Sequence, residues 1–474
     1  MRKTKIICTI GPATSSYENL EKLANAGMNV ARLNMSHGEH EGCAKIIKAI
    51  RTLNKKLNHP IAVLLDTQGP EIRTGDIKNE LNLKEGDIIS VVARGDADVE
   101  TSSIHINYEH IIHDVDVGDK ITVDNGLINL EVLSKEERTM QCRVVDGGIL
   151  KSKRHVNLPG IRVNLPAITE KDKRDIAFAV EQEVDFIALS FVRGPEDVQS
   201  LKTLLGDKAD KIKIISKIED QEGVKNLDAI VAESDGVMVA RGDLGVEIPF
   251  EMLPRVQRRI IRQCAIRGKR TIVATHMLES MIENPMPTRA EVTDVANAVY
   301  EEADAIMLSG ETTIGKHPFK CVEVLDKIAR SIEHSRGLRF SDQLLMNSDK
   351  QEIARAAVHL AESIDAKAIL VPTRRGFMAN MVTNCHPQKS IICAFTNDSR
   401  TRRQLVLNRN VLSYRINFSN DPEKTLGTAA NILLTRGDFS PSDKVVVISD
   451  ALSGSGVESV QIRQLRDLAR AADE

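Results

Sequence analysis

The segment IKIISKIE, residues 212–219, is an apolar, β-branched run that ends in Lys217 and Glu219. A continuous apolar run of this length is typical of a strand buried on both faces of a parallel sheet. Side chains alternate along a strand, so Lys217 and Glu219 point the same way, roughly 6.6 Å apart along the strand. Two opposite charges at the end of a buried strand predict a polar site at its carboxyl end.

Seven further runs of the same character occur along the chain. They cover residues 4–12, 28–36, 61–70, 184–192, 236–245, 270–278 and 305–312. Helix-like segments separate the runs, and one helix start carries a capping box, with Thr288 as N-cap and Glu291 three residues later. Buried strands that alternate with helices indicate a parallel sheet, and eight such strands predict a closed (β/α)8 TIM barrel, an α/β fold.

Two other segments depart from this alternation of barrel strands and helices. Residues 71–161 are turn-rich, with Asp-Asn-Gly at 124–126, and predict a small β-barrel domain inserted in a barrel loop. From about residue 339 the alternation of strands and helices restarts, which predicts a C-terminal open α/β domain over 339–474. The TIM barrel is therefore expected over residues 1–70 and 162–338. The tail IRQLRDLARAADE, 462–474, is expected to be helical.

The bulk composition narrows the classes of function. The chain has 474 residues, a formal net charge of −3, four Tyr and no Trp, so neither a basic surface nor stacking platforms for nucleic acid are expected. No apolar stretch is long enough to span a bilayer, and the basic start breaks at Gly11-Pro12, unlike a signal peptide. Seven scattered cysteines without a C-x-x-C pair fit reduced thiols, and a cytoplasmic location is expected.

Polar side chains collect where the predicted barrel strands end, which is the working face of a TIM barrel. They are Arg32, Asn34, Ser36, Asp66, Thr67, Lys217, Glu219, Arg241, Gly242, Asp243, Thr275, Ser309 and Glu311. Adjacent strands lie about 4.8 Å apart, so Glu219 and Asp243 can approach closely. At 4 Å their repulsion is about 4 kcal/mol for an effective dielectric of 20, and a divalent cation turns that cost into binding. Oxygen ligands favour Mg²⁺ or Mn²⁺ over Zn²⁺.

Each of these residues also has a plain structural interpretation. A strand-end lysine is usually solvated, a Glu/Asp pair is usually salt-bridged, and Arg32 could be a structural ion-pair partner. Together on one face of the predicted barrel, the residues predict a site that holds a cation and binds anions. The segment GETTIGKH, 310–317, nearly matches a phosphate-binding loop, but His317 stands where a hydroxyl must hold Mg²⁺, which argues against that motif.

Several ordered motifs resemble those of pyruvate kinases of the bacterial, three-domain type. They are NVARLNMSHG, LLDTQGPEIRTG, VNLPG, KIISKIEDQEG, MVARGDLGVEIP, ATHMLESMIENPMPTRAEVTDVANAV and DAIMLSGETTIGKHP. The resemblance runs from residue 4 to about 335 and continues more weakly to the end. It implies the last step of glycolysis, phosphoenolpyruvate + ADP → pyruvate + ATP, with Mg²⁺ (or Mn²⁺) and K⁺ as cofactors. It also implies a cytoplasmic homotetramer with no nucleic-acid or membrane partner.

The resemblance assigns roles to individual residues. Lys217, Arg32 and Thr275 would be catalytic, and with Gly242 and Asp243 they would bind the substrate. Glu219 and Asp243 would ligate Mg²⁺. Potassium would be held by Asn34, Ser36, Asp66 and Thr67, and the nucleotide by Asn34, His37, Arg73 and Arg154. The inserted domain would act as a lid that closes on the nucleotide.

Some positions depart from the family pattern. Gln68 stands where a lysine is usual, whereas Glu71 and Thr74 match the K⁺-dependent pattern. In the C-terminal domain, Phe377 and Met378 replace common hydroxyl residues of the effector loop, although Thr373, Arg374 and Arg375 could hold an anion and SDALSGSGVES resembles the closing loop. A phosphorylated effector therefore stays open as fructose 1,6-bisphosphate, a sugar monophosphate, AMP or none.

Two other classes of function compete with the kinase. A metal-dependent barrel lyase that acts through a pyruvate enolate would share the Glu/Asp pair, but it would not need the inserted lid, the K⁺ ligands or Lys217. A non-catalytic scaffold or sensor would be expected to lack central site residues, and this chain retains them. ADP-dependent release of pyruvate from phosphoenolpyruvate separates the kinase from both.

Overall fold

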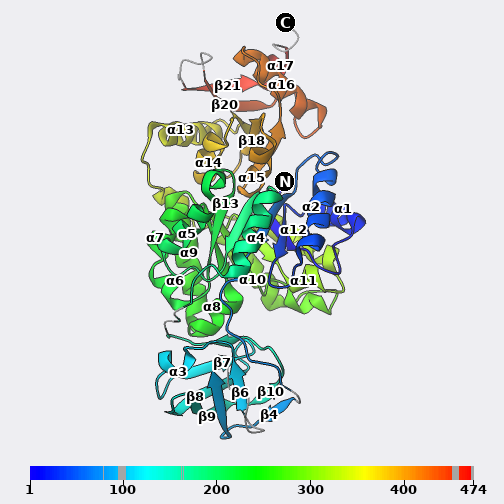
Figure 1. Ribbon diagram of the computed structural model, residues 1–474. Helices are drawn as coiled ribbons and strands as arrows, with labels where there is room; N and C mark the ends of the chain where they lie inside the picture. The colour runs from blue at the N-terminus through cyan, green and yellow to red at the C-terminus, as the bar shows by residue number, and fades with distance from the viewer. Residues whose placement is uncertain (78–79, 94–102, 162, 164, 451–457, 471–474) are drawn as a thin grey trace.

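The computed structural model describes residues 1–77, 80–93, 103–161, 163, 165–450 and 458–470. Figure 1 shows three stacked parts, with the barrel between the inserted domain and the C-terminal domain. Within the described residues, no helix combines the length and the apolar character that a membrane crossing requires.

The barrel consists of eight parallel strands, as predicted. They are β1 (Lys5–Thr9), β2 (Val30–Asn34), β3 (Ala62–Asp66), β12 (Phe186–Leu189), β13 (Lys213–Ile218), β14 (Gly236–Ala240), β15 (Arg270–Ala274) and β16 (Ala305–Leu308). The sheet closes in the order β1-β16-β15-β14-β13-β12-β3-β2, so strands that follow one another in the barrel are neighbours. All eight carboxyl ends therefore meet at one rim.

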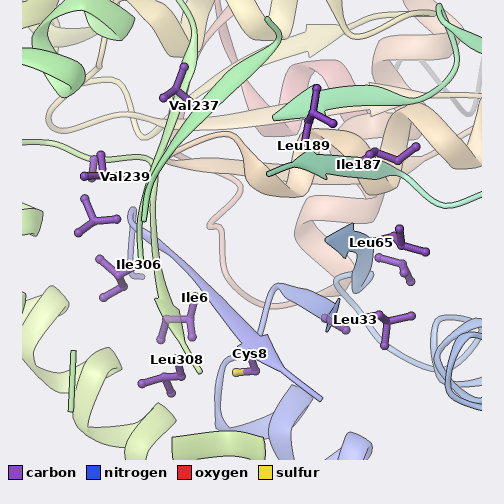
Figure 2. Close-up of a cluster of buried hydrophobic side chains, with 14 of the residues drawn as sticks. Ile6, Cys8, Leu33, Leu65, Ile187, Leu189, Val237, Val239, Ile306 and Leu308 are labelled. Atoms are coloured by element: carbon purple, nitrogen blue, oxygen red, sulfur yellow. The ribbon is translucent and has the colours of Figure 1, made fainter. Parts of the chain in front are cut away.

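Alternation along each strand divides the apolar core. Ile6 and Cys8 pack outward with helix residues such as Leu20, whereas Ile7 between them belongs to a cluster formed almost entirely by strand residues inside the barrel. Figure 2 shows the outward set, with Leu33, Leu65, Ile187, Leu189, Val237, Val239, Ile306 and Leu308. Because both faces of the sheet are buried, the strands read as continuous apolar runs.

The longer helices surround the strands. They are α1 (Tyr17–Ala26), α2 (His40–Leu53), α4 (Glu170–Glu181), α5 (Pro195–Leu205), α7 (Leu227–Glu233), α9 (Leu253–Arg267), α10 (Arg289–Tyr300) and α12 (Pro318–Ile332). The predicted capping box of α10 is present: the Thr288 hydroxyl accepts from the Glu291 N–H, and the Glu291 carboxylate accepts from the Thr288 N–H. Short helices α6 (Gln221–Lys225), α8 (Arg241–Glu247) and α11 (Gly310–Thr313) follow β13, β14 and β16 at the rim.

The inserted domain is a mostly antiparallel β domain, in which only the described pair β5–β6 is parallel, with helix α3 (Ile111–Asp114). Its strands are β4 (Leu81–Leu83), β5 (Ile88–Ala93), β6 (Ser103–Ile106), β7 (Lys120–Val123), β8 (Ile128–Lys135), β9 (Thr139–Asp146), β10 (Gly148–Leu150) and β11 (Val156–Asn157). Asp124, Asn125 and Gly126 all have positive φ and form the β7–β8 hairpin turn, as their sequence predicts.

The closed small barrel expected for this domain differs from the pairing of the described residues. Six strands form a sheet in the order β11-β7-β8-β9-β5-β6, and β10 pairs with β4 separately. Isolated bridges from Arg73 to His155 and from Thr74 to Ile106, with further backbone hydrogen bonds beside them, join the segment that enters the domain to both edges of the sheet. This segment thereby links the two edges, although it forms no strand of its own among the described residues.

The C-terminal domain is an open α/β sheet, as predicted. Its strands are β17 (Ala368–Pro372), β18 (Ile391–Thr396), β19 (Val411–Arg415), β20 (Lys444–Asp450) and β21 (Glu458–Gln464), in the order β19-β18-β17-β20-β21. The helices are α13 (Asp349–Ser363), α14 (Phe377–Asn384), α15 (Ser399–Gln404), α16 (Pro422–Thr435) and α17 (Leu465–Arg470). The expectation of a helix from Ile462 is wrong for its first residues, because Ile462–Gln464 pair antiparallel with β20.

Candidate active site

Four charged side chains form one network at the rim of the barrel. Lys217 Nζ lies 2.9 Å from Glu219 Oε1 and 3.2 Å from Asp66 Oδ1. Arg32 Nε donates to Asp66 Oδ2 at 2.6 Å. Asp66 is fully buried, and Lys217 and Arg32 are each 9% exposed. The predicted proximity of Lys217 and Glu219 is therefore observed, and Asp66 links them to Arg32.

Lys217 and Asp66 favour each other's charged forms. Burial alone would lower the pKa of Lys217, but Asp66 and Glu219 raise it above its ordinary value. Burial would likewise raise the pKa of Asp66, and Arg32 together with Lys217 lowers it instead. The Lys217 ammonium group thus stays positive in a shielded site, where a negative ligand interacts with it more strongly than in water.

Glu219 and Asp243 form the predicted acidic pair. Burial, helped by the nearby Asp243 charge, raises the pKa of Glu219 to about 7 against the opposing effect of Lys217. Burial also raises the pKa of Asp243. Two carboxyl groups that resist ionisation beside each other fit a divalent cation, which would favour both charged forms. Among the described residues, no group of three or more His, Cys, Asp or Glu side chains could hold a metal, so water or substrate oxygens would complete the shell.

The end of β15 carries a strained backbone. Thr275 and His276 have φ values of 67° and 54°, in the left-handed region that a β-branched residue rarely adopts. The Thr275 hydroxyl accepts a hydrogen bond from the Gly242 N–H at 2.8 Å. Arg241 donates to the carbonyl groups of Ala274 and Thr275, which holds this conformation.

Arg241 to Asp243 begin helix α8 and do not end a strand, contrary to the sequence interpretation. Strand β14 stops at Ala240, and the helix starts at the next residue. The Arg241 side chain is fixed by Asp294 of α10 at 2.7 Å. The turn therefore directs Gly242 and Asp243 toward the rim through the first residues of a helix.

The four residues predicted for K⁺ gather beside the network. The Ser36 N–H donates to Asn34 Oδ1 at 3.1 Å. The Thr67 carbonyl accepts from the Ser190 hydroxyl at 2.6 Å. The Asp66 carboxylate faces Arg32 and Lys217. Carbonyl, amide, hydroxyl and carboxylate oxygens on adjacent strand ends suit a hard monovalent cation.

The predicted nucleotide residues fall into two groups. Asn34 and His37 line a cavity of about 580 Å³ together with Arg32. Pro12, Glu39, Ile46, Thr313 and Ile314 also line this cavity. Arg73 and Arg154 are not part of its lining: Arg73 pairs with Glu71 at 2.7 Å and Arg154 lies 3.4 Å from Asp124. The structure brings together the first two residues and leaves the two arginines on the inserted domain.

Sequence reasoning missed two residues in direct contact with the network. Ser190 accepts a hydrogen bond from Lys217 Nζ at 2.8 Å, and Thr9 accepts from Arg32 Nη1 at 2.9 Å. Both follow or end apolar runs that the sequence analysis identified. Their positions at strand ends were therefore a usable signal, although a serine or threonine there is common.

Comparison with known proteins agrees with the fold. Family models described as "Pyruvate kinase, barrel domain" and "Pyruvate kinase, alpha/beta domain" match residues 1–322 and 351–461. A pyruvate kinase of Bacillus licheniformis is 44% identical over 469 residues, which cover 97% of this chain and 80% of the relative. One of Geobacillus stearothermophilus is 43% identical over 454 residues, covering 94% and 77%.

A solved structure leads to the same family. The crystal structure of a pyruvate kinase from Cryptosporidium parvum superposes with a TM-score of 0.92 at 35% identity, covering 98% of this chain and 96% of that one. A barrel, an inserted β domain and a C-terminal α/β domain thus recur in one order at substantial sequence identity. The chain belongs to the pyruvate kinase family.

Proposed function

We propose that this protein transfers the phosphoryl group of phosphoenolpyruvate to ADP, giving pyruvate and ATP. The observation that carries the proposal is the rim network, in which Lys217 and Arg32 are buried in ion pairs beside the Glu219 and Asp243 carboxyl groups. Phosphoryl transfer depends mainly on positioning and charge neutralisation rather than on covalent chemistry by the protein. The cavity lined by Arg32, Asn34 and His37 adjoins the same network and has room for a nucleotide.

Lys217 and Arg32 would act on the group in transfer. The bond between phosphorus and the enol oxygen of phosphoenolpyruvate breaks, and a terminal β-phosphate oxygen of ADP forms the new bond to phosphorus. The electron pair of the broken bond stays on the enolate, which takes a proton at its methylene carbon to become pyruvate. Lys217 Nζ, which now contacts Glu219 and Asp66, is placed to follow the phosphoryl oxygens. Such preorganised charge acts strongly where water is excluded.

The metal would be Mg²⁺ or Mn²⁺, held by Glu219 and Asp243. The raised pKa values of these carboxyl groups and their oxygen-only chemistry support this assignment. When bound, a divalent cation neutralises phosphoryl charge and stabilises the enolate oxygen. Asn34, Ser36, Asp66 and Thr67 would hold K⁺ beside it.

Thr275 and Gly242 would serve the carboxylate end of the substrate. The Gly242 N–H now donates to the Thr275 hydroxyl at 2.8 Å, so both polar groups face the same space at the start of α8. An incoming carboxylate could take these donors, and the Thr275 hydroxyl could direct a water toward the enolate carbon. Holding both reactants in line contributes roughly 7–11 kcal/mol in favourable cases.

The inserted domain would close as a lid over the nucleotide. Arg154 supports this role, because its Nε is buried and has no hydrogen-bond partner among the residues that the structure describes. A phosphate oxygen would satisfy it. Arg73, on the segment that enters the domain, would approach from the same side as the lid closes.

Regulation through the C-terminal domain is a second part of the proposal. Arg374 and Arg375 are exposed and line a cavity of about 890 Å³ with Lys211, Arg400 and Arg403. Glu183, Asp210 and Asp398 also line the cavity, and Arg400 and Arg403 pair with Glu183 and Asp185, so Arg374 and Arg375 are the residues that support a phosphorylated effector. The phosphoenolpyruvate saturation curve would show its identity when candidate sugar phosphates and AMP are added. The loop SDALSGSGVES falls largely outside the described residues. A cytoplasmic homotetramer is the expected state of the protein.

One assay tests the proposed reaction. Purified protein with Mg²⁺, K⁺, phosphoenolpyruvate and ADP should release pyruvate, measured by coupling to lactate formation, and should form ATP in equal amount. Release of pyruvate without ADP would favour a phosphatase or lyase instead, and no release in either mixture would overturn the proposal.

A further inference from the structure

Helix α8 touches the inserted domain at both of its ends. At the start of the helix, Asp243 Oδ1 lies 3.7 Å from His155 Nδ1. At its last residue, Glu247 Oε1 accepts a hydrogen bond from Asn157 Nδ2 at 2.9 Å. His155 and Asn157 belong to the segment by which the chain returns from the inserted domain to the barrel, which includes β11.

The two contacts are spaced equally along the helix and along the extended segment. Asp243 and Glu247 are four residues apart and share one face of the helix, at a rise of about 6 Å. His155 and Asn157 are two residues apart and share one side of an extended segment, at about 6.6 Å. Because the two spacings agree, one face of α8 and one side of the returning segment lie in register along the whole helix.

Glu247 is the more firmly bound of the two helix residues. Besides Asn157, the backbone N–H of Leu158 donates to its carboxylate, and its backbone carbonyl accepts from Gln221 Nε2 at 2.6 Å. Asn157 is 4% exposed, and its side-chain oxygen has no hydrogen-bond partner in the part of the chain that the structure describes. The Asn157 side chain is therefore held chiefly by the bond that it donates to Glu247.

Outside α8, Arg193 donates to the carbonyl groups of Val163 and Leu165, and the His155 ring lies near the Phe191 ring, so these contacts also join the returning segment to the barrel. A cavity of about 590 Å³ separates them, lined by His155, Asn157 and Leu158 from the inserted domain and by Asp220, Gln221 and Glu247 from the barrel. Toward α8 itself, the returning segment is joined by the polar contacts of Glu247 and by the pair of His155 and Asp243.

We propose that Glu247 is a positioning residue that couples the lid to the substrate site through α8. The inference rests on the proposed function. A shift of the returning segment moves Glu247, and a helix of two turns passes that shift to Gly242 and Asp243 at its other end. Closing of the lid on ADP would thereby bring the groups that serve phosphoenolpyruvate and the metal into their reactive positions.

The test removes each partner of the bond separately and together. Glu247→Ala and Asn157→Ala should each lower kcat/KM for ADP on the order of tenfold, as for loss of a hydrogen bond to a charged group. The double variant should lose no more than either single one, because both remove the same link. Glu247→Gln keeps an acceptor for Asn157 and should stay within about threefold of the wild type.

The kinetic pattern separates positioning from a general loss of stability. In the wild type, saturating ADP should lower KM for phosphoenolpyruvate, and this effect should vanish in Glu247→Ala and Asn157→Ala. The matched control is Glu301→Gln, a buried barrel carboxyl group that accepts from Gln257 and Arg258 far from the lid. It should lower the melting temperature and leave the effect of ADP intact.

Additive losses in the double variant, wild-type kinetics in Glu247→Ala, or an equal effect of Glu301→Gln would each overturn the inference. If Glu247→Ala does not fold, Asn157→Ala takes its place as the variant that removes the bond. Glu247→Gln then remains the variant that should stay near the wild type. Hydrogen exchange gives a readout independent of activity: amides 156–158 and 242–246 should lose protection together in Asn157→Ala. Loss at 156–158 alone would contradict the coupling even if the wild type proved inactive, which would count against the proposed function only.

Discussion

Lys217 Nζ and Glu219 Oε1 lie 2.9 Å apart at the carboxyl end of β13. The pair stands in a buried site where Asp66 and Arg32 complete a chain of alternating charges. Removing one partner of a buried ion pair leaves an uncompensated charge and costs about 3–5 kcal/mol. The network therefore fixes the side chains at the rim and keeps the Lys217 ammonium group charged.

The identity of residue 71 is expected to decide whether the activity depends on K⁺. Glu71 Oε1 lies 3.4 Å from the Ser36 hydroxyl, and Gln68 Nε2 donates to Glu71 Oε2 at 3.2 Å, so a carboxylate borders the proposed K⁺ site. In buffer free of K⁺ and Na⁺, the wild type should lose activity on the order of tenfold or more. Glu71→Lys should retain activity there, because its ammonium group takes over the role of the ion. Full wild-type activity without K⁺ would refute this prediction.

The hydroxyl of Thr275 is expected to matter for chemistry, whereas its methyl group is not. Thr275→Ser should keep kcat within about threefold and Thr275→Ala should lower it by about 10²-fold, as for loss of a proton-transfer or oxyanion donor. Thr271→Ala, on the same strand but at the opposite end of the barrel, controls for the loss of a buried threonine. Steady-state rates with saturating ADP measure the effect, and equal rates for Thr275→Ala and wild type would remove Thr275 from the mechanism.

A buried lysine gives a pH dependence of stability with a definite sign. Lys5 is 4% exposed and donates to the Val411 carbonyl of the C-terminal domain at 2.7 Å. Burial, with Arg2 nearby, lowers its pKa from 10.5 to about 7. Between pH 7 and 10.5 the unfolded chain therefore binds more protons than the folded protein. Lys5 lowers the free energy of unfolding most below pH 7, and this destabilisation decreases as the pH rises toward 10.5.

Lys5→Met should consequently be more stable than the wild type at pH 6. The difference in free energy of unfolding should shrink as the pH rises from 7 toward 10, as measured by denaturant titration. Lys45→Met, at an exposed helix position where Lys45 pairs with Glu41, should show no such trend. A constant difference across this range would contradict the lowered pKa.

The sequence was sufficient for the barrel because each strand is buried on both faces and reads as an apolar run. It was insufficient for β21, an edge strand in which Ile462 is 52% exposed and most residues are polar, and which runs directly into the charged helix α17, so that the two together resemble one polar helix. The four charged residues of the rim network could be predicted from strand ends, whereas their neighbours Ser190 and Thr9 were missed. The bond between Asn157 and Glu247 could not, because it depends on how α8 lies in register with a segment 90 residues earlier in the chain.

The backbone at the rim also escaped prediction. Phe191, which follows β12, and Thr275, which follows β15, both have a positive φ in the left-handed region, although neither is glycine. Tertiary contacts impose these conformations: the Phe191 N–H donates to Glu219 Oε2 at 2.7 Å, and Arg241 holds the Thr275 carbonyl. Local propensity carries no signal for either contact.

The rate of ADP-dependent pyruvate formation by Lys217→Met tests the central claim most directly. Lys213→Met is the matched control, since Lys213 begins the same strand and pairs with Asp235 at 3.0 Å. Lys217→Met should be slower than the wild type by at least about 10²–10³-fold while Mn²⁺ still binds, and Lys213→Met should be close to the wild type. A folded Lys217→Met protein that forms pyruvate at the wild-type rate would contradict the role proposed here for the ammonium group.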